Sequence, residues 1–414
     1  MTVDDLVICA VGDFCPQPRS SKKAERELLA GVDGLLSQAD LRIVNVEVPL
    51  TTSKRPITKS GPHLIAPPSV ADVLKGRFDI ALLANNHILD HGPRGALQTI
   101  QALHRRGLRT VGAGENREQA SRPLIISAKG FSIAILNACE HEFGVAGEHS
   151  AGGAGLEPFW MIREIMSLRA RHDVVLVFTH GGNEMNPLPS PRVVAMNRAF
   201  AEAGASAVIN THPHVPQAIE NWRGTPIAYS LGNFVFDNRI VDLDAREPLW
   251  WVGMAALLRF RKVGGSTKAS MTPVFTKPDP SSARLRLIRG EEREWLSQWL
   301  GEISRVLKDE RVLQEYFDAW AAAHGGYYLR ALHRATDAGA GRGRRRLAGL
   351  RNLWTCEAHN ELIRTFVELR FEGRLGAARS RLPTLRRWMA GELSAPAGPG
   401  RMRDGRRSSR EEQA

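Results

Sequence analysis

The strongest signal for the fold lies in three segments: V-L-V-F-T-H-G-G-N-E (175–184), V-I-N-T-H-P-H (208–214) and I-A-Y-S-L-G-N-F-V-F-D (227–237). Each begins with a short apolar run, which is typical of a buried strand. The first two runs lead to His180 and to the pair His212 and His214. Because an open α/β sheet places its ligand site at strand ends, the pattern predicts imidazoles gathered at one edge of a sheet.

These three histidines favour a metal site. For any one of them, a loop histidine satisfied by its neighbours is the simpler interpretation. A His-x-His pair at one strand end, a third histidine at another and carboxylates upstream favour metal ligation instead, because imidazole is the commonest metal ligand in proteins.

The same pattern occurs three more times nearer the N-terminus. Apolar runs at 6–11, 41–44 and 78–84 end at Gly12-Asp13, Asn45-Val46-Glu47 and Asn85-Asn86-His87, and Asp90 follows three residues later. Mixed imidazole and carboxylate shells suit Zn²⁺, Mn²⁺ or Fe, whereas Ca²⁺ and Mg²⁺ prefer oxygen. These strand ends together supply enough ligands for two divalent ions.

Predicted strands alternate with helices from residue 6 to about residue 236, and this order predicts a largely parallel sheet flanked by helices. Helical spacing covers residues 24–38, 95–106, 158–171 and 193–203. Three further strands at 250–262, 269–277 and 284–288 are expected to be antiparallel. The loops at 51–68 and 140–155 leave strand ends and are placed to cover or shape a substrate.

From residue 291 the chain becomes helical, at 291–308, 314–334 and 351–371, with a Gly/Arg segment at 339–349 between the last two. The tryptophans Trp295 and Trp299 lie at helical spacing, where a packing face is favoured over a ligand platform. The chain therefore divides into an α/β domain (1–290), a helical extension (291–392) and a disordered basic tail (393–414).

The net charge of +12 is concentrated near the C-terminus. Residues 339–414 hold 17 Arg, no Lys and 8 acidic residues, a net of +9, so the rest of the chain carries about +3. Nucleic acid is therefore not the favoured partner of the α/β domain. Apolar residues and arginines alternate over 374–389, which would suit peripheral contact with an anionic membrane. A helix packed on the domain with its arginines in water is the favoured alternative.

The four cysteines include no C-x-x-C pair, which argues against a disulfide framework and for a reducing compartment. The N-terminus lacks the basic region of a signal peptide, and no apolar run reaches the length of a membrane span. The expected location is the cytoplasm.

An ordered set of motifs resembles the bacterial CapA family, also called the poly-γ-glutamate synthesis protein type, over about residues 5–260. The motifs are G-D-F (12–14), N-V-E-V-P-L-T (45–51), N-N-H-I-L-D-H-G (85–92), H-G-G-N-E (180–184), H-P-H-V-P-Q (212–217) and Y-S-L-G-N-F-V-F-D (229–237). That family is similar to the calcineurin-like metallophosphoesterases. The resemblance implies an α/β fold of the four-layer αββα metallophosphoesterase type, two sheets between helices, here with a C-terminal helical extension.

The resemblance also implies roles for single residues. The implied metal ligands are Asp13, Glu47 as the bridging ligand, Asn86, His180, His212 and His214. Asp13, His180 and His214 are expected in one shell, and Asn86 and His212 in the other. The superfamily places a histidine two residues after the first aspartate, and this chain has Cys15 there.

Catalytic and substrate roles follow by the same analogy. His87 is expected to act as a general acid or transition-state donor, positioned by Asp90; an N-cap before Gly92-Pro93 is an equal interpretation of Asp90. Asn233 and Glu184 are candidates for substrate contact, and a solvated surface position is an equal interpretation of Glu184. Asn210 and Asp237 are candidates to orient the ligating histidines.

The leading functional hypothesis is a divalent-metal-dependent hydrolase with a dinuclear site, acting in capsule, exopolysaccharide or poly-γ-glutamate biosynthesis. It would cleave a phosphoester or a γ-glutamyl amide of a capsule polymer, alongside polymer-synthesis machinery. The alternative is a non-catalytic metal-binding accessory protein that carries or organises the polymer or its synthase, and Cys15 motivates it.

Overall fold

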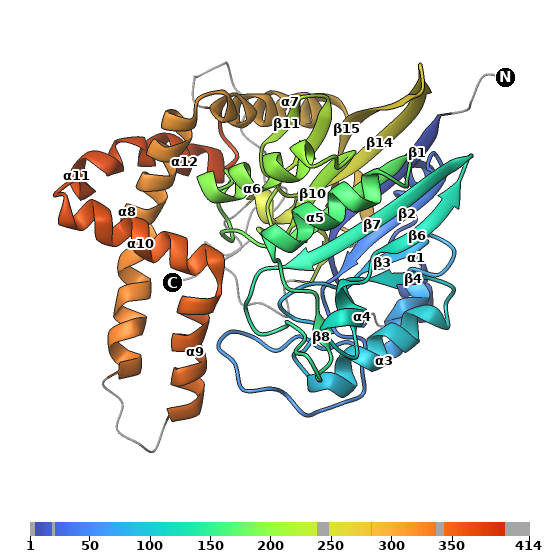
Figure 1. Cartoon of the computed structure of the whole chain (residues 1–414), viewed down its shortest axis with the longest axis horizontal. Helices are drawn as coiled ribbons and strands as arrows, with labels where there is room; N and C mark the ends of the chain where they lie inside the picture. The colour runs from blue at the N-terminus through green and yellow to red at the C-terminus, as the bar shows by residue number, and fades with distance from the viewer. Residues whose placement is uncertain (1–4, 19–20, 238–247, 283, 337–342, 394–414) are drawn as a thin grey trace, which may run out of the picture.

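The computed structural model describes residues 5–18, 21–237, 248–282, 284–336 and 343–393. Two large β-sheets form its centre (Figure 1). The eight-stranded sheet contains β1 (Leu6–Cys15), β2 (Leu41–Val46), β3 (Ile80–Leu82), β4 (Arg109–Val111), β13 (Asn233–Phe236), β14 (Gly253–Val263), β15 (Ser266–Pro278) and β16 (Leu285–Leu287). The six-stranded sheet contains β6 (Leu124–Ala128), β7 (Phe131–Cys139), β9 (Val174–His180), β10 (Ala207–Thr211), β11 (Ile219–Trp222) and β12 (Thr225–Ala228). A small pair joins β5 (Ala113–Gly114) and β8 (Gly152–Gly153).

The strand directions place polar residues at a shared edge. Strands β1 to β4 run parallel in sequence order, and β7, β9 and β10 run parallel in the other sheet. The polar motifs lie at or directly after the carboxyl ends of these strands. Strands β14, β15 and β16 are added antiparallel, so the antiparallel pairing predicted for this region is confirmed.

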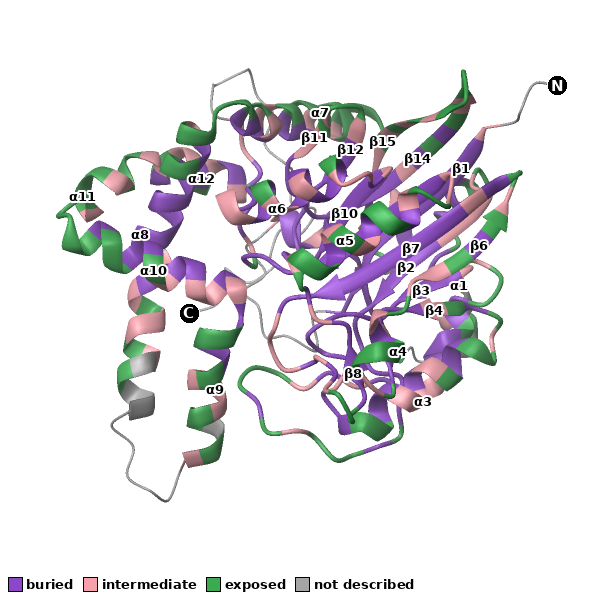
Figure 2. Cartoon of the chain, in the orientation of Figure 1, coloured by how far each residue is buried: buried purple, intermediate pink, exposed green. Residues whose placement is uncertain are grey.

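Strand β1 shows how the layers are built. Leu6, Ile8 and Ala10 join the core that also contains the buried strands β7, β9 and β10. Cys9 and Val11, on the opposite face, pack in a second core with the helices that precede β2 and follow β3. Alternate residues of a strand point to opposite faces, so one apolar strand serves both cores. Figure 2 shows these central strands buried.

Helices cover the outer faces of the sheets. They are α1 (Lys22–Glu27), α2 (Asp33–Leu36), the 3-10 helix η1 (Pro68–Val73), α3 (Gly92–His104), α4 (Arg117–Ser121), α5 (Pro158–Arg169) and α6 (Pro191–Glu202). In Figure 1, α5 and α6 lie over the sheet that contains β7 and β10. The mixed α/β class is therefore confirmed.

The single helix predicted at 24–38 is wrong. Helix α1 ends at Glu27 and α2 begins only at Asp33. Between them Gly31 approaches β16 so closely that a Cβ there would lie 2.3 Å from the Leu285 carbonyl oxygen. A continuous helix would remove this contact, so the tertiary packing overrides the helical spacing.

The C-terminal region is helical, as predicted. It contains α7 (Gly290–Arg305), η3 (Val306–Lys308), α8 (Glu310–Thr336), α9 (Gly343–Thr355), α10 (Glu357–Phe371), α11 (Leu375–Ala378), η4 (Arg379–Arg381) and α12 (Leu382–Met389), and the 3-10 helix η2 (Pro248–Trp251) precedes it. The helix predicted at 351–371 is two helices, because Cys356 is extended (φ −73°, ψ 122°). Helix α9 also begins inside the Gly/Arg segment that was expected to separate helices.

The tryptophan stripe of α7 is a packing face, as predicted. Trp299 is fully buried in the same core as the two sheets, and its Nε1 donates to the Trp388 carbonyl oxygen (3.2 Å). The domain boundary at 290/291 stays a prediction. The predicted disordered tail lies, apart from Leu393, outside the described residues.

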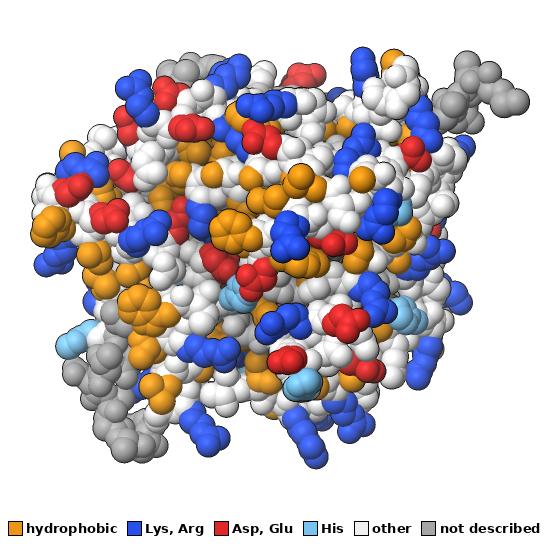
Figure 3. All heavy atoms as spheres, in the orientation of Figure 1, with side chains coloured by type: hydrophobic (Ala, Val, Ile, Leu, Met, Phe, Trp, Pro, Cys, Tyr) orange, Lys and Arg blue, Asp and Glu red, His pale blue; other side chains and the backbone are white. Residues whose placement is uncertain are grey.

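On the face drawn in Figure 3, Lys and Arg side chains are scattered among acidic and apolar groups rather than gathered in one patch. Within the described residues, no helix is both long enough and apolar enough to cross a membrane. All four cysteines are free and buried.

Candidate metal centre

The predicted ligands meet between the two sheets. Asp13 lies in β1 and Glu47 follows β2, whereas His180 ends β9 on the other sheet. His212 and His214 follow β10, and all of these side chains are buried. Residues from opposite ends of the α/β region therefore form one cluster, called the metal centre below.

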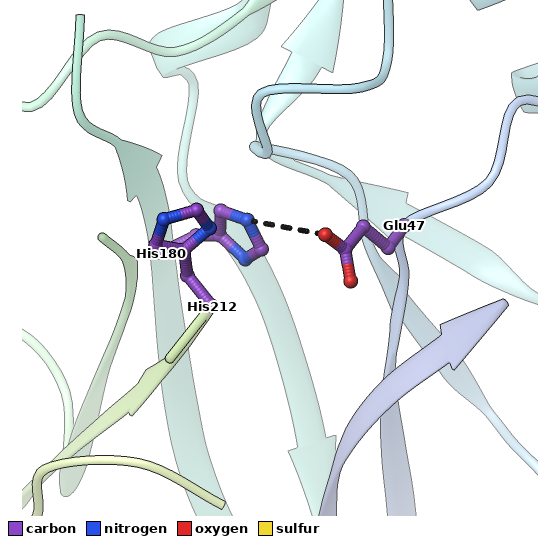
Figure 4. Close-up of side chains that lie close together, drawn as sticks. All are labelled: Glu47, His180 and His212. Atoms are coloured by element: carbon purple, nitrogen blue, oxygen red, sulfur yellow. Dashed lines mark ion pairs between the residues drawn. The ribbon is translucent and has the colours of Figure 1, made fainter. Parts of the chain in front are cut away.

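Glu47 lies at the middle of the metal centre. Its Oε1 is 3.7 Å from His214 Nε2, 3.8 Å from His180 Nε2 and 3.9 Å from His87 Nε2. In Figure 4 the His180 and His212 imidazoles face the Glu47 carboxylate, which approaches from the other sheet. These distances exceed the hydrogen-bond range of about 2.7–3.2 Å. Two ligand atoms each about 2.1 Å from one Zn²⁺ are roughly 3.4 Å apart at a tetrahedral angle, so the spacing fits shared ligation better.

Unsatisfied polar atoms support the fit to a metal. Among the described residues, the two Glu47 carboxylate oxygens have no hydrogen-bond partner, and His212 Nδ1 has none either. Burying an ionised carboxylate without a partner destabilises the folded state by about several kcal/mol. A divalent cation would remove that cost.

Of the three groups of candidate ligand atoms in the described part of the chain, two share Glu47. One contains Asp13, Glu47 and His214, and the other Glu47, His180 and His212; within each group the ligand atoms lie within 4.8 Å of one another. Asn86 belongs with the second, since its Oδ1 is 3.2 Å from His180 Nε2. This partition differs from the expected one, because His180 Nε2 points to Asn86 and Glu47 rather than to Asp13.

Burial dominates the acid–base properties of the centre. It raises the pKa of Asp13 to about 6, although the hydrogen bond from Asn45 lowers it. Burial, together with the neighbouring Asp13 charge, raises the pKa of Glu47 well above its usual value. Burial also lowers the pKa of His214 to about 4 and holds that of His180 well below its usual value. His180 and His214 are therefore neutral, as metal ligation requires, whereas the raised pKa values of Asp13 and Glu47 mean that a bound cation would displace protons from these carboxyl groups.

Neighbouring polar groups fix the orientation of the ligands. Asn45 Nδ2 donates to Asp13 Oδ1 (2.7 Å). His180 Nδ1 lies 3.0 Å from Thr211 Oγ1, and His214 Nδ1 lies 3.0 Å from Asn233 Oδ1. Each contact leaves the other ring nitrogen directed at Glu47, as is usual for metal-ligating histidines.

The backbone of the His-x-His segment is strained. His212 and His214 adopt φ values of 98° and 61°, in the region that non-glycine residues rarely occupy. His212 N also donates to Asp13 Oδ2 (3.2 Å), which ties the segment to β1. Such strain costs on the order of 1–3 kcal/mol per residue and is typical of functional sites.

His87 and Asp90 form a pair beside Glu47. His87 Nδ1 lies 2.7 Å from Asp90 Oδ2, which also accepts from Leu64 N (2.6 Å). The buried Lys59 ammonium contacts Asp90 and lies 3.2 Å from His87 Nδ1. Burial and the Lys59 charge lower the pKa of His87, so its imidazole is neutral at pH 7. Asp90 contacts the His87 ring and does not cap α3, whose N-cap is His91 without a side-chain cap.

The structure places the remaining candidates as follows. Asn233 Oδ1 contacts His214 Nδ1, so this side chain is placed to orient the His214 ring, and its contact with substrate stays a prediction. Glu184 is exposed, and its carboxylate lies within 4.8 Å of ligand atoms of His212 and His214. Cys15 is fully buried and belongs to none of the metal-ligating groups in the described part of the chain. Asn210 donates to the Gly181 and Tyr229 carbonyl oxygens, so it supports the chain beside His180 without touching a ligating ring.

The residues of the site that were given no role in advance include Asn45, Lys59 and Glu142. Asn45 follows an apolar run, so the strand-end pattern pointed to it. Lys59 lies in a loop with no regular pattern, and nothing in the sequence marks its contact with Asp90. Glu142 Oε1 is 3.9 Å from His212 Nε2, and its Oε2 accepts from Asn352 of α9 (3.5 Å).

Fold and ligand set together define an α/β protein with a two-sheet core and a buried histidine–carboxylate centre suited to divalent metals. The profile of the family described as "Bacterial capsule synthesis protein PGA_cap" matches residues 7–238, and the chain belongs to that family. The family is part of the metallophosphoesterase-like superfamily. The predicted membership of the CapA family is confirmed.

Two relatives are similar to part of this chain. Over 175 residues the chain is 34% identical to "Capsule biosynthesis protein CapA" of Bacillus anthracis, which covers 41% of this chain and 43% of that protein. Over 247 residues it is 31% identical to "PGA biosynthesis protein CapA" of Bacillus subtilis (strain 168). This match covers 57% of this chain and 65% of that protein. The chain therefore spans less than two thirds of the length of either relative. Among solved structures, a hypothetical protein from Thermus thermophilus aligns with a TM-score of 0.40 at 15% identity, over 66% of this chain and 99% of that one.

Proposed function

We propose that the chain is a divalent-metal-dependent hydrolase with a dinuclear centre that acts in the synthesis, trimming or release of a capsule polymer such as poly-γ-glutamate. The observation that carries the proposal is Glu47, a fully buried carboxylate with nitrogens of three histidines 3.7–3.9 Å from one oxygen. The helix–sheet–sheet–helix packing supports the four-layer arrangement of metallophosphoesterases as its fold.

The ligand set favours Zn²⁺, Mn²⁺ or Fe over Ca²⁺ or Mg²⁺, because imidazoles predominate. Asp13, Glu47 and His214 would hold one ion, and Glu47, Asn86, His180 and His212 the other. Two such ions supply an activated water nucleophile and neutralise charge on the attacked group.

The chain itself supplies proton transfer. In the hydrolysis of an amide, water adds to the carbonyl carbon, the C–N bond breaks and the leaving nitrogen takes a proton. His87 Nδ1 faces the Asp90 carboxylate, so the neutral ring carries its proton there and leaves Nε2 free on the side of Glu47. In this proposal Nε2 takes a proton from the attacking water and then passes it to the leaving nitrogen. Asp90, held by Lys59 and by Leu64 N, keeps the ring in place. The same donor would serve the leaving oxygen of a phosphoester.

The test compares Glu47→Gln with a surface control, Glu118→Gln, whose side chain is largely exposed. Metal content is measured by elemental analysis, and hydrolysis with p-nitrophenyl phosphate and γ-glutamyl-p-nitroanilide. Wild type should retain about two ions per chain. Replacing a residue that only hydrogen-bonds a metal ligand typically lowers metal affinity roughly 10- to 100-fold. Glu47→Gln should lower it by more than this and should abolish hydrolysis. Glu118→Gln should behave as wild type, and a wild-type protein without stoichiometric metal would refute the proposal.

Cys15 favours a second candidate, a metal-binding accessory protein that carries or organises the polymer or its synthase without cleaving it. Burial raises the pKa of its thiol well above the usual value, so the thiol is protonated when no metal is bound. Hydrolysis that disappears in Glu47→Gln would exclude this candidate.

A further inference from the structure

The C-terminal helices contact the metal centre through the three residues that follow β7, residues 140–142. We propose that these helices position Glu142 as the carboxylate partner of the ligand His212, and that Asn352 of α9 holds Glu142 in place. The inference rests on the metal centre of the proposed function and does not depend on which bond is cleaved. The matched family profile ends at residue 238, so the helices lie outside it.

His212 is the ligand histidine whose orientation the contacts described above leave unexplained. Its Nδ1 is buried and has no hydrogen-bond partner among the described residues, so this nitrogen is available to a metal. Its Nε2 lies 3.9 Å from Glu142 Oε1, and within the described residues no other carboxylate oxygen lies within 4 Å of this ring. A ligating histidine commonly donates its second ring N–H to a carboxylate. Glu142 is therefore the residue placed to orient His212.

The position of Glu142 depends on the C-terminal helices. The 3.9 Å separation is longer than a hydrogen bond of about 2.7–3.2 Å, so whatever holds the Glu142 side chain decides whether the contact forms. Asn352 Nδ2 donates to Glu142 Oε2 (3.5 Å) and also lies 3.4 Å from His359 Nδ1 of α10. The His359 ring packs on the Tyr328 ring of α8, with 5.0 Å between centroids. One side chain from each of three helices therefore converges on Glu142.

Asn352 is an unusual residue for a packed interface. It is buried, and its Oδ1 has no hydrogen-bond partner among the described residues. Most buried side-chain polar atoms have a partner, because an unpaired one destabilises the folded state. Packing alone does not account for an asparagine here, whereas the donor that it offers to Glu142 does.

The residues that precede Glu142 are fixed to the same helices. Glu140 Oε2 accepts from Ala358 N of α10 (3.2 Å), and Glu140 N donates to the carbonyl oxygen of the ligand His180 (3.0 Å). His141 N donates to Glu357 Oε2 (2.8 Å), also on α10. Each of the three residues after β7 thus bonds to α9 or α10, beside two of the metal ligands.

Buried charges make this attachment rigid. Arg192 of α6 donates to Glu140 Oε1 (2.5 Å) and to Glu361 Oε2 of α10 (2.9 Å), and both carboxylates are buried. Moving α10 away would leave these charges unpaired in the interior, which is strongly unfavourable. The residues that support a metal site must hold its ligands within about 0.5 Å. A junction of this kind is suited to that task.

The test uses the full chain and Zn²⁺ titrated in competition with a chelating dye that resolves two binding steps. His212→Ala identifies the step of the ion that His212 holds. Glu142→Gln should weaken this step roughly 10- to 100-fold, the usual loss when the partner of a ligand is changed. Asn352→Leu keeps the side-chain volume and removes the donor, so it should weaken the same step about tenfold. The step of the ion held by Asp13 and His214 should not change.

Three further proteins sharpen the test. Asn360→Leu is the matched control, because the Asn360 side chain forms no hydrogen bond within the described residues; both steps should equal those of wild type. His359→Phe keeps a ring against Tyr328 and removes Nδ1, so it should weaken the His212 step about threefold, as for a neutral hydrogen bond. The double variant of Glu142→Gln and Asn352→Leu should bind no more weakly than Glu142→Gln alone, because Asn352 acts through Glu142.

The outcomes separate this inference from the proposed function. Wild-type affinity in Asn352→Leu, equal weakening of both steps, or additive losses in the double variant would overturn the inference. If Asn352→Leu does not fold, the His212 step of His359→Phe decides in the same way. A wild type that binds no Zn²⁺ would refute the metal centre and this inference with it. A wild type that binds two ions without hydrolysis would refute the hydrolase and leave the role of Asn352 standing.

Discussion

At the scale of single residues, Gly12 determines how closely β1 approaches the segment that leads into β13. A Cβ at this position would lie 1.9 Å from the Gly232 carbonyl oxygen, which also accepts from Asp13 N (3.1 Å). Gly12→Ala must therefore push the two backbones apart and displace Asp13. We expect a loss of about 1–3 kcal/mol in the free energy of unfolding, the usual cost of overpacking, and weaker metal binding. Urea unfolding and a metal titration would measure both.

The matched control is Gly34→Ala. This glycine lies in α2, and a Cβ there would meet nothing within 4 Å. Alanine restricts the unfolded chain and suits a helix, so this variant should gain up to about 1 kcal/mol. If Gly12→Ala unfolds at the same urea concentration as wild type, the close approach of β1 and Gly232 has no energetic role.

The sequence predicted the residues of the site whose position depends on strand ends. Asp13, Glu47, Asn86 and the three histidines all follow apolar runs, and parallel strands bring such positions to one edge. Lys59 could not be predicted in this way. Its partner Asp90 is 31 residues away, and their contact depends on the path of an irregular loop.

At the scale of elements, most helices were predicted from the spacing of their apolar residues. The break between α1 and α2 and the break between α9 and α10 were not predicted. Gly31 and Cys356 interrupt helical patterns because other elements hold the chain there. Because the helix is interrupted at Cys356, the first turn of α10 contacts the chain just after β7. There Glu140 Oε2 accepts a hydrogen bond from Ala358 N (3.2 Å). A helix continuous through Cys356 would lose this contact. Local spacing carries no information about a partner more than 200 residues away.

The start of α10 should stabilise the protein in a pH-dependent way. Glu357 accepts from His141 N (2.8 Å) and contacts His141 Nδ1 (2.6 Å), and this hydrogen bond is the main cause of the raised pKa of His141. A raised folded-state pKa stabilises the protein below the unfolded pKa of about 6.5, and the effect is lost as pH rises through the folded pKa. Glu357→Gln should therefore cost about 0.5–1 kcal/mol more at pH 5.5 than at pH 9.

Urea unfolding of both proteins at the two pH values measures this difference. Glu368→Gln, an exposed position on the same helix, is the control and should show the same cost at both. A cost for Glu357→Gln that does not change with pH would mean that the His141 charge contributes nothing to the contact.

At the scale of the whole molecule, the C-terminal helices share one core with the sheets. Leu296, Trp299 and Ile303 of α7 are buried together with strands of both sheets. Polar contacts join the same parts: Ile219 N donates to Ser304 Oγ (2.9 Å), and the buried Arg198 donates to the Leu307 carbonyl oxygen (2.8 Å). The helical region is therefore part of the same packed core as the sheets.

Truncation tests this dependence. A chain ending at residue 289 loses α7 and all later helices, which exposes the apolar face under α7 and leaves Arg198 without the Leu307 carbonyl. Burial stabilises by about 1.5–3 kcal/mol for each large apolar side chain, so losing several exceeds a typical stability of about 5–15 kcal/mol. We expect this chain to lack a cooperative thermal transition and to bind a hydrophobic dye. A chain ending at residue 393 keeps every described helix, and it should melt within a few degrees of the full chain. Cooperative unfolding and metal binding by the shorter chain would show instead that the α/β part folds alone.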